Sequence, residues 1–360
     1  MAATRPPPRP ARGATRNTES ARFNLPSIEA DGDWLDAREG IDGVAPPLRT
    51  TVTVERPRTI ISRNTSPDVP FDRSINPYRG CEHGCIYCFA RPTHAYLDLS
   101  PGLDFESRLF AKPDAAALLR AELRRPGYEV RPMALGTNTD PYQPIEREWR
   151  VTRGVLEVLA ETDHPVTITT KSDRVTRDLD LLGSMAAKGL ASVCISITSL
   201  DPAVARKVEP RAPTPERRLK AVRALTQAGV PVYVSIAPVI PAVTDHEIEH
   251  LLERAAAAGA RFAFFIPVRL PHEVAPLFRA WLDEHFPDRA GKVMATIRSL
   301  RGGRDNDPGF GTRMKGEGPW AALLRTRFHI ACRKLGLNAE RVALRCDLFR
   351  PPAGPQGELF

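Results

Sequence analysis

The chain has no long uncharged hydrophobic run and few cysteines for its length. No stretch of its 360 residues approaches the roughly 18 uncharged apolar residues that a membrane-spanning helix needs. Six cysteines are too few for a disulfide framework, and residues 1–16, rich in Pro and Arg, lack the apolar segment of a secretory signal. We therefore expect a cytoplasmic protein with no membrane partner. Its hydrophobic residues, 42% of the chain, are enough to form a sizeable core.

Two common signatures are also missing. No G-x-G-x-x-G follows a strand-like segment, so a dinucleotide site has no support. There is also no second array of closely spaced cysteines that would hold a further metal cluster. What the chain has instead, from about residue 73, is a regular alternation of strand-like and helix-like segments.

This alternation comprises about six β/α units. Strand-like segments lie at 74–78, 130–135, 165–170, 191–198, 230–240 and 261–268. Helix-like segments lie at 114–125, 151–160, 179–188, 215–228, 245–258 and 273–285. Because strands that alternate with crossover helices form parallel sheets, the pattern predicts a doubly wound open sheet or an incomplete barrel.

Two extensions flank this core. Residues 1–70 are predicted to be a Pro- and Arg-rich, irregular N-terminal extension, with disorder expected to about Asn17. Residues 71–286 form the predicted β/α core. Residues 287–360 are predicted to be a basic C-terminal extension, whose helix at 320–335 packs back on the core.

Polar and reactive side chains gather at the ends of the predicted strands. A cysteine-rich segment follows the first strand, the loop 136–141 follows the second, and Lys171 follows the third. Ser196 lies near the end of the fourth strand, and the segment 235–241 ends the fifth. Because active sites of parallel folds form at the carboxyl ends of the strands, this pattern predicts a functional site there.

The cysteine-rich segment contains Cys81, Cys85 and Cys88 in the spacing C-x3-C-x2-C. A zinc site needs a fourth ligand, which His83 or His94 could supply. An iron–sulfur cubane accounts for three cysteines directly, because its fourth iron then stays open for a small chelating ligand. From the residues alone, both kinds of metal site remain open.

The motif C-x3-C-x-Tyr-C, just after the first strand of a β/α fold, resembles that of the radical S-adenosylmethionine superfamily. The resemblance covers residues 73–270 and implies an α/β fold of the partial (β/α)6, TIM-like barrel class. It also implies that the three cysteines hold a [4Fe–4S] cluster whose open iron binds S-adenosylmethionine. One electron, from a reductant such as flavodoxin or ferredoxin, would then generate a 5′-deoxyadenosyl radical that abstracts hydrogen from a substrate.

Further residues resemble the spore photoproduct lyase branch of this superfamily. The matching residues are Thr139-Asp140-Pro141, Thr170-Lys171 and Ser196-Ile197, and the segment around Pro238 lies where many members contact the adenine. The resemblance implies cofactor contacts by Tyr87, Thr139, Asp140, Lys171, Ser196 and Pro238. Four of these also have an ordinary structural interpretation: Lys171 as a solvated strand end, Ser196 as a sheet hydroxyl, Asp140 as a turn residue and the segment around Pro238 as barrel core.

Two departures from the lyase pattern concern its hydrogen-transfer residues. Thr137 stands where the lyase has its hydrogen-donor cysteine, and Phe89 stands where it has a tyrosine after the third cysteine. A hydroxyl is a far poorer hydrogen-atom donor than a thiol. We therefore predict a lyase-like enzyme that acts on a different, unassigned substrate.

Positive charge is concentrated near the C-terminus. Residues 288–350 carry 14 Lys and Arg against 6 Asp and Glu, which accounts for the whole net charge of +8. Such a region is compatible with a nucleic-acid substrate, or with simple solvated surface charge. The alternative function is a non-enzymatic zinc- or cluster-containing nucleic-acid-binding protein. A radical enzyme acting on a peptide or small metabolite is a third interpretation.

Overall fold

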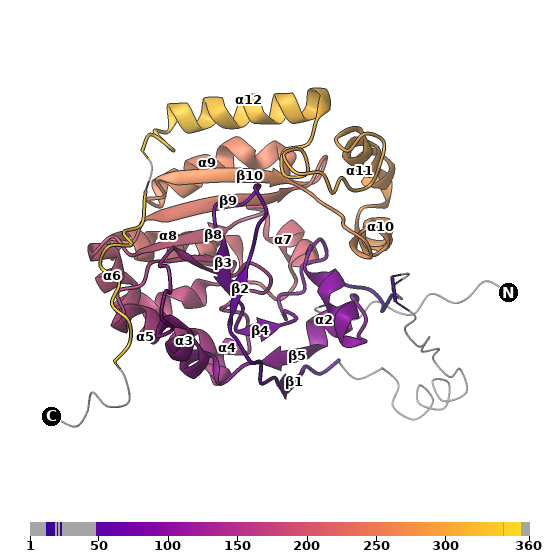
Figure 1. Cartoon of the computed structure of the whole chain (residues 1–360). Coiled ribbons are helices and arrows are strands. Elements are labelled where there is room, and N and C mark those ends of the chain that lie inside the picture. Colours follow the sequence, from indigo (N-terminus) through magenta and orange to yellow (C-terminus); the bar gives the residue numbers. More distant parts are fainter. Residues whose placement is uncertain (1–11, 19, 21, 24–47, 341, 354–360) are drawn as a thin grey trace.

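The computed structural model describes residues 12–18, 20, 22–23, 48–340 and 342–353. Six strands form the parallel part of its main sheet. They are β3 (Arg73–Ile75), β6 (Met133–Leu135), β7 (Val166–Thr170), β8 (Ala191–Ser196), β9 (Val232–Val239) and β10 (Phe262–Pro267). They lie in this order across the sheet, and every neighbouring pair is parallel. The structure thus confirms the predicted α/β fold of a partial, TIM-like barrel (Figure 1).

Helices cover the outer face of this sheet. The helices that follow the first five strands are α3 (Ala115–Leu123), α5 (Val151–Glu161), α6 (Leu179–Ala187), α8 (Pro215–Gln227) and α9 (Ile248–Ala257). In β8, Val193 and Ile195 are fully buried in the apolar core that the sheet shares with these helices. Cys194, between them, points to the other face because side chains alternate along a strand. The apolar core therefore lies on the helix side, and the concave side is left for polar groups.

Shorter elements fill the connections. They are η1 (Arg91–Leu97), α2 (Asp104–Ser107), α4 (Glu146–Trp149), η2 (Asp173–Asp178), α7 (Pro202–Val208) and η3 (Asp245–Glu247). β2 (Ile61–Arg63) adds to the edge of the main sheet, antiparallel to β3. A small second sheet contains β1 (Thr51–Val54), β5 (Arg108–Ala111) and β4 (Tyr78–Arg79). Since β4 ends directly before Gly80, this sheet fixes where the cysteine-rich segment begins.

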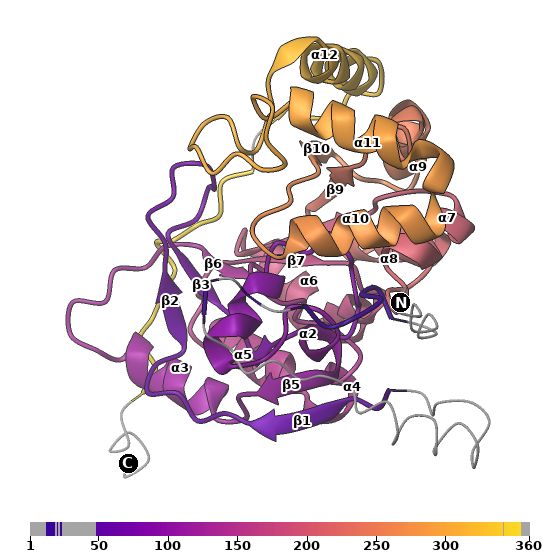
Figure 2. The ribbon, with the colours of Figure 1, turned by 90° about the vertical axis from the view of Figure 1, so that its right-hand side faces the viewer.

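Two helices that follow β10 form a second apolar core. α10 (Val274–His285) and α11 (Pro287–Ser299) pack against each other beside the barrel mouth (Figure 2). Cys85, Ile86 and Tyr87 are buried in this second core. The sequence predicts α10 within one residue, but α11 was missed because residues 288–350 were interpreted only through their charge.

The C-terminal helix α12 (Gly318–Lys334) begins two residues before its predicted start and ends one residue before its predicted end. It lies along α9 at the upper edge of the molecule in Figure 1. Leu324 and Phe328 are buried there, and the Phe328 ring lies 4.8 Å from that of Phe265. None of the described helices is long and apolar enough to cross a membrane.

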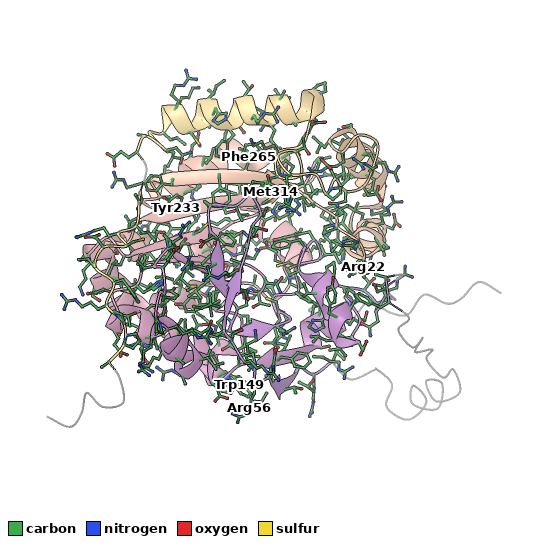
Figure 3. All side chains as sticks on the ribbon, in the orientation of Figure 1. Arg22, Arg56, Trp149, Tyr233, Phe265 and Met314 are labelled. Atoms are coloured by element: carbon green, nitrogen blue, oxygen red, sulfur yellow. The ribbon has the colours of Figure 1, made fainter. Side chains whose placement is uncertain are left out.

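The N-terminal extension also contributes ordered contacts. The backbone N–H groups of Gly13 and Ala14 donate to the buried carboxylate of Glu106 at 2.9 and 2.8 Å. Arg22, labelled in Figure 3, forms an ion pair of 3.0 Å with Glu273. These contacts include residues of the stretch for which disorder is expected, and that expectation stays a prediction. The rest of that prediction, residues 1–11, lies outside the described residues, and the boundaries at 70 and 287 stay predictions.

Candidate functional site

The loop that carries the three cysteines joins β4 to η1 and bends sharply at two glycines. Gly80 and Gly84 adopt φ values of 73° and 69°, a conformation that strongly favours glycine. A Cβ at Gly84 would also lie 2.8 Å from Glu106 Oε2. Cys81 and Cys85 are buried, and Cys88 is partly buried. The glycines thus allow a tight loop with three thiols inside the barrel mouth.

A fully buried arginine holds this loop in shape. Arg91 Nε donates to the carbonyl of Cys85 at 2.9 Å, and its NH2 group donates to the carbonyl of Gly84 at 3.2 Å. The charge of Arg91 is balanced by Glu106, at 2.5 Å. Because removing one partner of a buried ion pair leaves an uncompensated charge, this pair is expected to be essential to the loop.

The loop after β6 is tied to the cysteine loop through one amide side chain. Gln143 Oε1 accepts a hydrogen bond from the N–H of Glu82 at 3.0 Å. Its Nε2 group donates to the carbonyl of Gly80 at 3.1 Å. Gln143 is fully buried, and nothing in the sequence marks it except its place after a strand end.

Asp140 joins three of the segments that the sequence predicts to meet. Its carboxylate accepts from Thr170 Oγ1 at 2.6 Å and from the N–H of Lys171 at 2.8 Å, both at the end of β7. His83 Nδ1, in the cysteine loop, lies 3.3 Å from it. Burial raises the pKa of Asp140, but His83 and the hydrogen bonds outweigh burial and lower that pKa to about 2. Asp140 also accepts from the N–H of Tyr142, which is the predicted turn bond.

Lys171 lies directly beside the cysteine loop. Its ammonium is 5.8 Å from the centroid of the Tyr87 ring. Burial lowers the pKa of Lys171, but Cys85, Glu209 and Asp140 together raise it above the ordinary value. Among the described residues, the ammonium donates no hydrogen bond. Lys171 is therefore a partly buried cation with open donors, not the solvated strand end that was the alternative interpretation.

A buried ion pair behind Tyr87 is the main feature that the sequence analysis missed. The Tyr87 hydroxyl donates to Glu209, which also accepts from Thr198 Oγ1 at 2.7 Å. Arg218 forms an ion pair of 2.5 Å with Glu209. Although burial raises the pKa of Glu209, Arg218 and Lys171 keep it below its usual value. Arg218 is one of several charged residues in a helix whose pattern is typical of a protein surface, so its burial could hardly be predicted from the sequence.

Ser196 and Pro238 meet at an irregularity in β9. Ser196 Oγ donates to the carbonyl of Ala237 at 3.2 Å, and Thr198 Oγ1, which donates to Glu209, lies 3.3 Å from the same carbonyl. The pairing of β9 with β10 shifts register between Phe265 and Pro267. Pro238 lies at this shift, one residue before the end of β9, as expected of a proline in a parallel strand.

Two threonines lie on the β6 loop: Thr139, which belongs to the predicted set, and Thr137, which stands where the lyase has its cysteine. Thr139 is buried, and its Oγ1 donates to the carbonyl of Tyr78 at 3.2 Å. Thr137 Oγ1 donates to Asn76 Oδ1 at 3.3 Å, at the end of β3. The structure thus brings the predicted residues together at the carboxyl ends of the strands. Their roles as cofactor ligands stay predictions.

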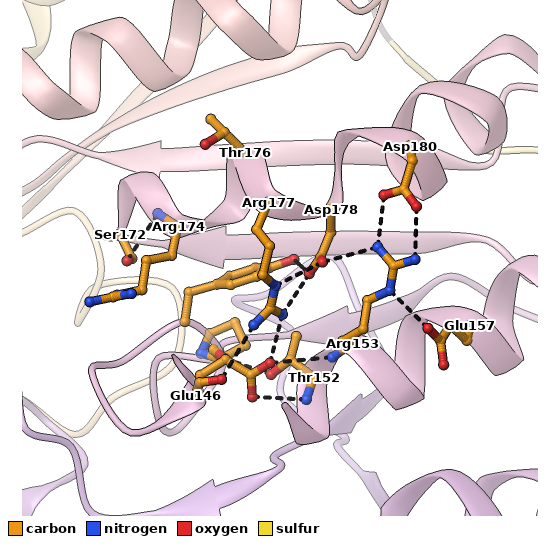
Figure 4. A network of polar contacts seen from close by, with 12 residues as sticks. Glu146, Thr152, Arg153, Glu157, Ser172, Arg174, Thr176, Arg177, Asp178 and Asp180 are labelled. Carbon is orange, nitrogen blue, oxygen red and sulfur yellow. Dashed lines mark hydrogen bonds and ion pairs between the residues drawn. The ribbon is translucent and has the colours of Figure 1, made fainter. Parts of the chain in front are cut away.

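A polar network behind the site fixes the loops that follow β6 and β7 (Figure 4). Glu146, fully buried, accepts from Arg177 at 2.7 Å and from the N–H of Thr152 at 3.0 Å. Arg177 also contacts Asp178, at 2.8 Å, and Arg153 lies 3.3 Å from the same carboxylate. Because these residues come from both loops, the network ties the two loops to each other.

The three thiols do not converge on one point. Among the described residues, no group of three His, Cys, Asp or Glu side chains is placed to hold a single metal ion. His83 is engaged by Asp140, and His94 Nε2 lies 2.9 Å from the carbonyl of Arg108. Burial raises the pKa of Cys81 far above the usual range and that of Cys85 to about 12. A strongly electron-withdrawing centre would be needed to make these thiols ligands.

Comparison with known proteins identifies relatives over the same region. A family model described as the Radical SAM superfamily matches residues 75–255, half of the chain. An uncharacterized protein of Mycobacterium tuberculosis (strain ATCC 25618 / H37Rv) is 41% identical over 232 residues, which cover 64% of this chain and 68% of that protein. An uncharacterized protein of Methanocaldococcus jannaschii is 25% identical over 215 residues, covering 59% of this chain and 76% of that protein.

Similar solved structures include spore photoproduct lyase. Its complex with dinucleoside spore photoproduct superimposes with a TM-score of 0.57 at 19% sequence identity, covering 79% of this chain and 80% of the lyase. A mutant of the lyase superimposes over 89% of this chain and 88% of its own, with a TM-score of 0.57 at 18% identity. At this level of identity, the likeness is one of fold.

Proposed function

Because the chain belongs to the Radical SAM superfamily, we propose that it is an enzyme that cleaves S-adenosylmethionine at a [4Fe–4S] cluster held by Cys81, Cys85 and Cys88. The observation that carries the proposal is the three-thiol loop at the carboxyl ends of the strands, beside a cation with open donors. The cluster, when bound, supplies the electron that splits the sulfonium into methionine and a 5′-deoxyadenosyl radical.

The donor set of the loop fits such a cluster. A cubane takes its three thiolates on three different irons, so the thiols need not point at one atom. Arg91 holds the carbonyls of Gly84 and Cys85, which keeps the loop open around its centre. Buried thiols with raised pKa values ionise only next to a strong positive centre, and iron supplies one.

Lys171 and Tyr87 are proposed to orient S-adenosylmethionine. An ammonium without an acceptor would pair with the carboxylate of the methionine moiety. Tyr87 is held by Glu209 and presents its ring to the same space, so it would flank the adenine. Ser196 and Pro238, with the Ala237 carbonyl between them, would line the ribose and adenine side.

Asp140 and Thr139 are proposed to act through their neighbours. The Asp140 carboxylate is occupied by Thr170, Lys171 and His83, and Thr139 is bonded to β4. These contacts fix the backbone of Lys171 and the β6 loop against the cysteine loop. Asp140 would thus position the cofactor site rather than contact the cofactor with a free oxygen.

The substrate is proposed to differ from that of the lyase, and a nucleic acid is compatible with the charge of the chain. Thr137 and Phe89 replace the hydrogen-transfer residues expected from the lyase pattern. Some of the positive charge in 288–350 is paired within the protein: Arg327 binds Glu249 at 2.6 and 2.7 Å. Flavodoxin or ferredoxin is the proposed reductant, and a cytoplasmic location stays a prediction.

The test is anaerobic reconstitution with iron and sulfide, followed by dithionite and S-adenosylmethionine, with chromatography for 5′-deoxyadenosine. Wild type should form 5′-deoxyadenosine, and Cys85→Ala should lose both product and most of the iron. Cys346→Ala is the matched control, because it removes a partly buried thiol far from the loop in sequence. One bound zinc and no cleavage would instead support the non-enzymatic alternative. Full cleavage by Cys85→Ala would contradict the cluster assignment.

A further inference from the structure

An arginine at the end of the last strand lies beside the cysteine loop. Arg269 follows β10 by two residues, at the carboxyl end of the sheet. Its guanidinium carbon is 5.9 Å from the centroid of the Phe89 ring. Phe89 comes directly after Cys88, and 53% of its surface is exposed. The barrel mouth therefore presents a cation and an exposed aromatic ring next to the third cysteine.

Arg269 has no anionic partner in contact with it among the described residues. Its one hydrogen-bond acceptor there is the thioether of Met314, 2.9 Å from NH1 (Met314 is labelled in Figure 3). Its Nε is buried and makes no hydrogen bond. A guanidinium carries five N–H donors, and a thioether is a weak acceptor. A partly buried arginine with such poor partners is poised for an acceptor from outside the protein.

The surroundings of Arg269 carry excess positive charge. Burial, together with Arg313 and Arg301, lowers the pKa of Arg269 to about 10. Asp68 is the carboxylate that opposes this effect, but it is already bound by Arg313 Nε at 2.5 Å and by the N–H of Gly311 at 2.7 Å. The local excess of cations therefore favours an anion.

Arg301 fixes the geometry of this surface. It is almost fully buried and donates to the carbonyls of Val268 at 3.1 Å and Arg313 at 2.7 Å. It therefore ties the end of β10 to the loop that follows α11. Figure 2 shows this loop beside the loop that follows β2, which carries Asp68.

A second exposed aromatic ring lies on the loop that follows α11. Phe310 is 62% exposed, and the guanidinium carbon of Arg313 is 4.5 Å from the centroid of its ring. Arg313 precedes Met314, the residue that contacts Arg269. Exposed aromatic rings interleaved with arginines are the arrangement that binds bases and phosphates together.

We propose that Phe89, Arg269, Phe310 and Arg313 form a nucleotide-binding surface, with a phosphate bound by Arg269 and a base stacked on an exposed phenylalanine. Phosphate is the anion for which a guanidinium is best shaped, through paired N–H donors. The proposal that this surface binds a nucleotide depends only on these contacts. That the nucleotide belongs to the substrate rests on the proposed function, because the surface adjoins the cysteine loop.

The test measures binding, not catalysis. The cluster-reconstituted full chain is titrated into a fluorescent single-stranded oligothymidylate of about 12 nucleotides, and anisotropy is recorded at several salt concentrations. Arg269→Gln should weaken binding about tenfold and reduce the slope of log affinity against log salt by about 1. Phe310→Ala should weaken binding by about fivefold or more. Arg120→Gln, an exposed arginine on α3 paired with Glu161, is the charge-matched control and should bind as wild type does.

Competition identifies the source of the nucleotide. If unlabelled oligothymidylate displaces the probe and thymidine monophosphate does not, the ligand is a strand. If thymidine monophosphate displaces it equally well, the ligand is a free nucleotide. Both results support the proposed nucleotide-binding surface. Absence of binding, or equal binding by wild type and Arg269→Gln with circular dichroism showing both folded, overturns it. Binding without formation of 5′-deoxyadenosine would contradict the proposed function and leave the surface standing.

Discussion

The two ends of strand β7 bury polar groups in opposite ways. At its amino end, His164 Nε2 is 2.8 Å from the Tyr128 hydroxyl, and Nδ1 is 3.0 Å from the carbonyl of Pro165. Both ring nitrogens therefore have partners, and the Phe349 ring packs on the imidazole at 5.4 Å. At its carboxyl end, the Lys171 ammonium lies over Tyr87 and has no hydrogen bond among the described residues.

In this fold, the groups that stabilise the structure and the groups that can bind a ligand lie at opposite ends of the strand. A satisfied buried group contributes to folding and offers nothing to a ligand, whereas a buried group with open donors costs stability unless a ligand supplies the missing partner. Arg269, at the end of β10, shares this property with Lys171. In parallel β/α folds, the amino ends of strands serve stability and the carboxyl ends serve function.

Glu209 is a strong test of this comparison, because it lies at the carboxyl end but already has partners within the protein, in Tyr87, Thr198 and Arg218. Glu209→Ala would leave Arg218 buried without its ion-pair partner. We expect the free energy of unfolding to fall by about 3–5 kcal/mol, measured by urea denaturation followed by circular dichroism. Glu161→Ala, which removes an exposed partner of Arg120, should cost less than about 1 kcal/mol. Equal losses of unfolding free energy for the two variants would contradict this expectation.

The stability contributed by the amino end of β7 should depend on pH. Burial lowers the pKa of His164 to about 4, whereas an unfolded histidine titrates near about 6.5. Because the unfolded chain binds the proton first, the stability from neutral His164 is complete above about pH 6.5 and is lost as the pH falls to about 4. The loss is on the order of 3 kcal/mol.

Burial also lowers the pKa of His94 to about 4. A variant of His164 therefore separates the contribution of His164 from that of His94. His164→Gln should be less stable than wild type at about pH 7, and the difference should shrink as the pH approaches 4. Urea denaturation at several pH values measures both proteins. A difference that stays constant with pH would show that His164 does not titrate as its burial requires.

At the carboxyl end, Lys171→Met should change binding and not folding. Loss of a charge-assisted hydrogen bond is expected to weaken S-adenosylmethionine about tenfold, measured by calorimetric titration of the reconstituted protein. The iron content and the free energy of unfolding should stay close to wild type, since the ammonium bonds to none of the described residues. Lys188→Met, on an exposed lysine paired with Asp163, is the control. An unchanged affinity for S-adenosylmethionine would show that Lys171 has only a structural role.

Much of the fold was predictable because it depends on local patterns. Apolar residues at helical spacing, such as Val151, Val155 and Leu159, predicted α5 and its buried face. Parallel pairing then required the strand ends to meet, which is why Asp140, Lys171 and Ser196 could be assigned to one region. The missed helix α11 shows the limit, since its charge pattern was interpreted without its apolar face.

The β/α order, the two glycines and three cysteines of the loop, and the polar strand ends could all be recognised in the sequence. These features follow from residue type and spacing along the chain, which local sterics and periodicity control. The burial of Arg218 against Glu209, and the contacts of Arg269 with Phe89 and the Met314 thioether, are visible only in the folded structure. The physical reason is that the partners of a charged side chain come from segments far apart in sequence. Whether such a charge is satisfied or left open depends on packing that no local pattern records.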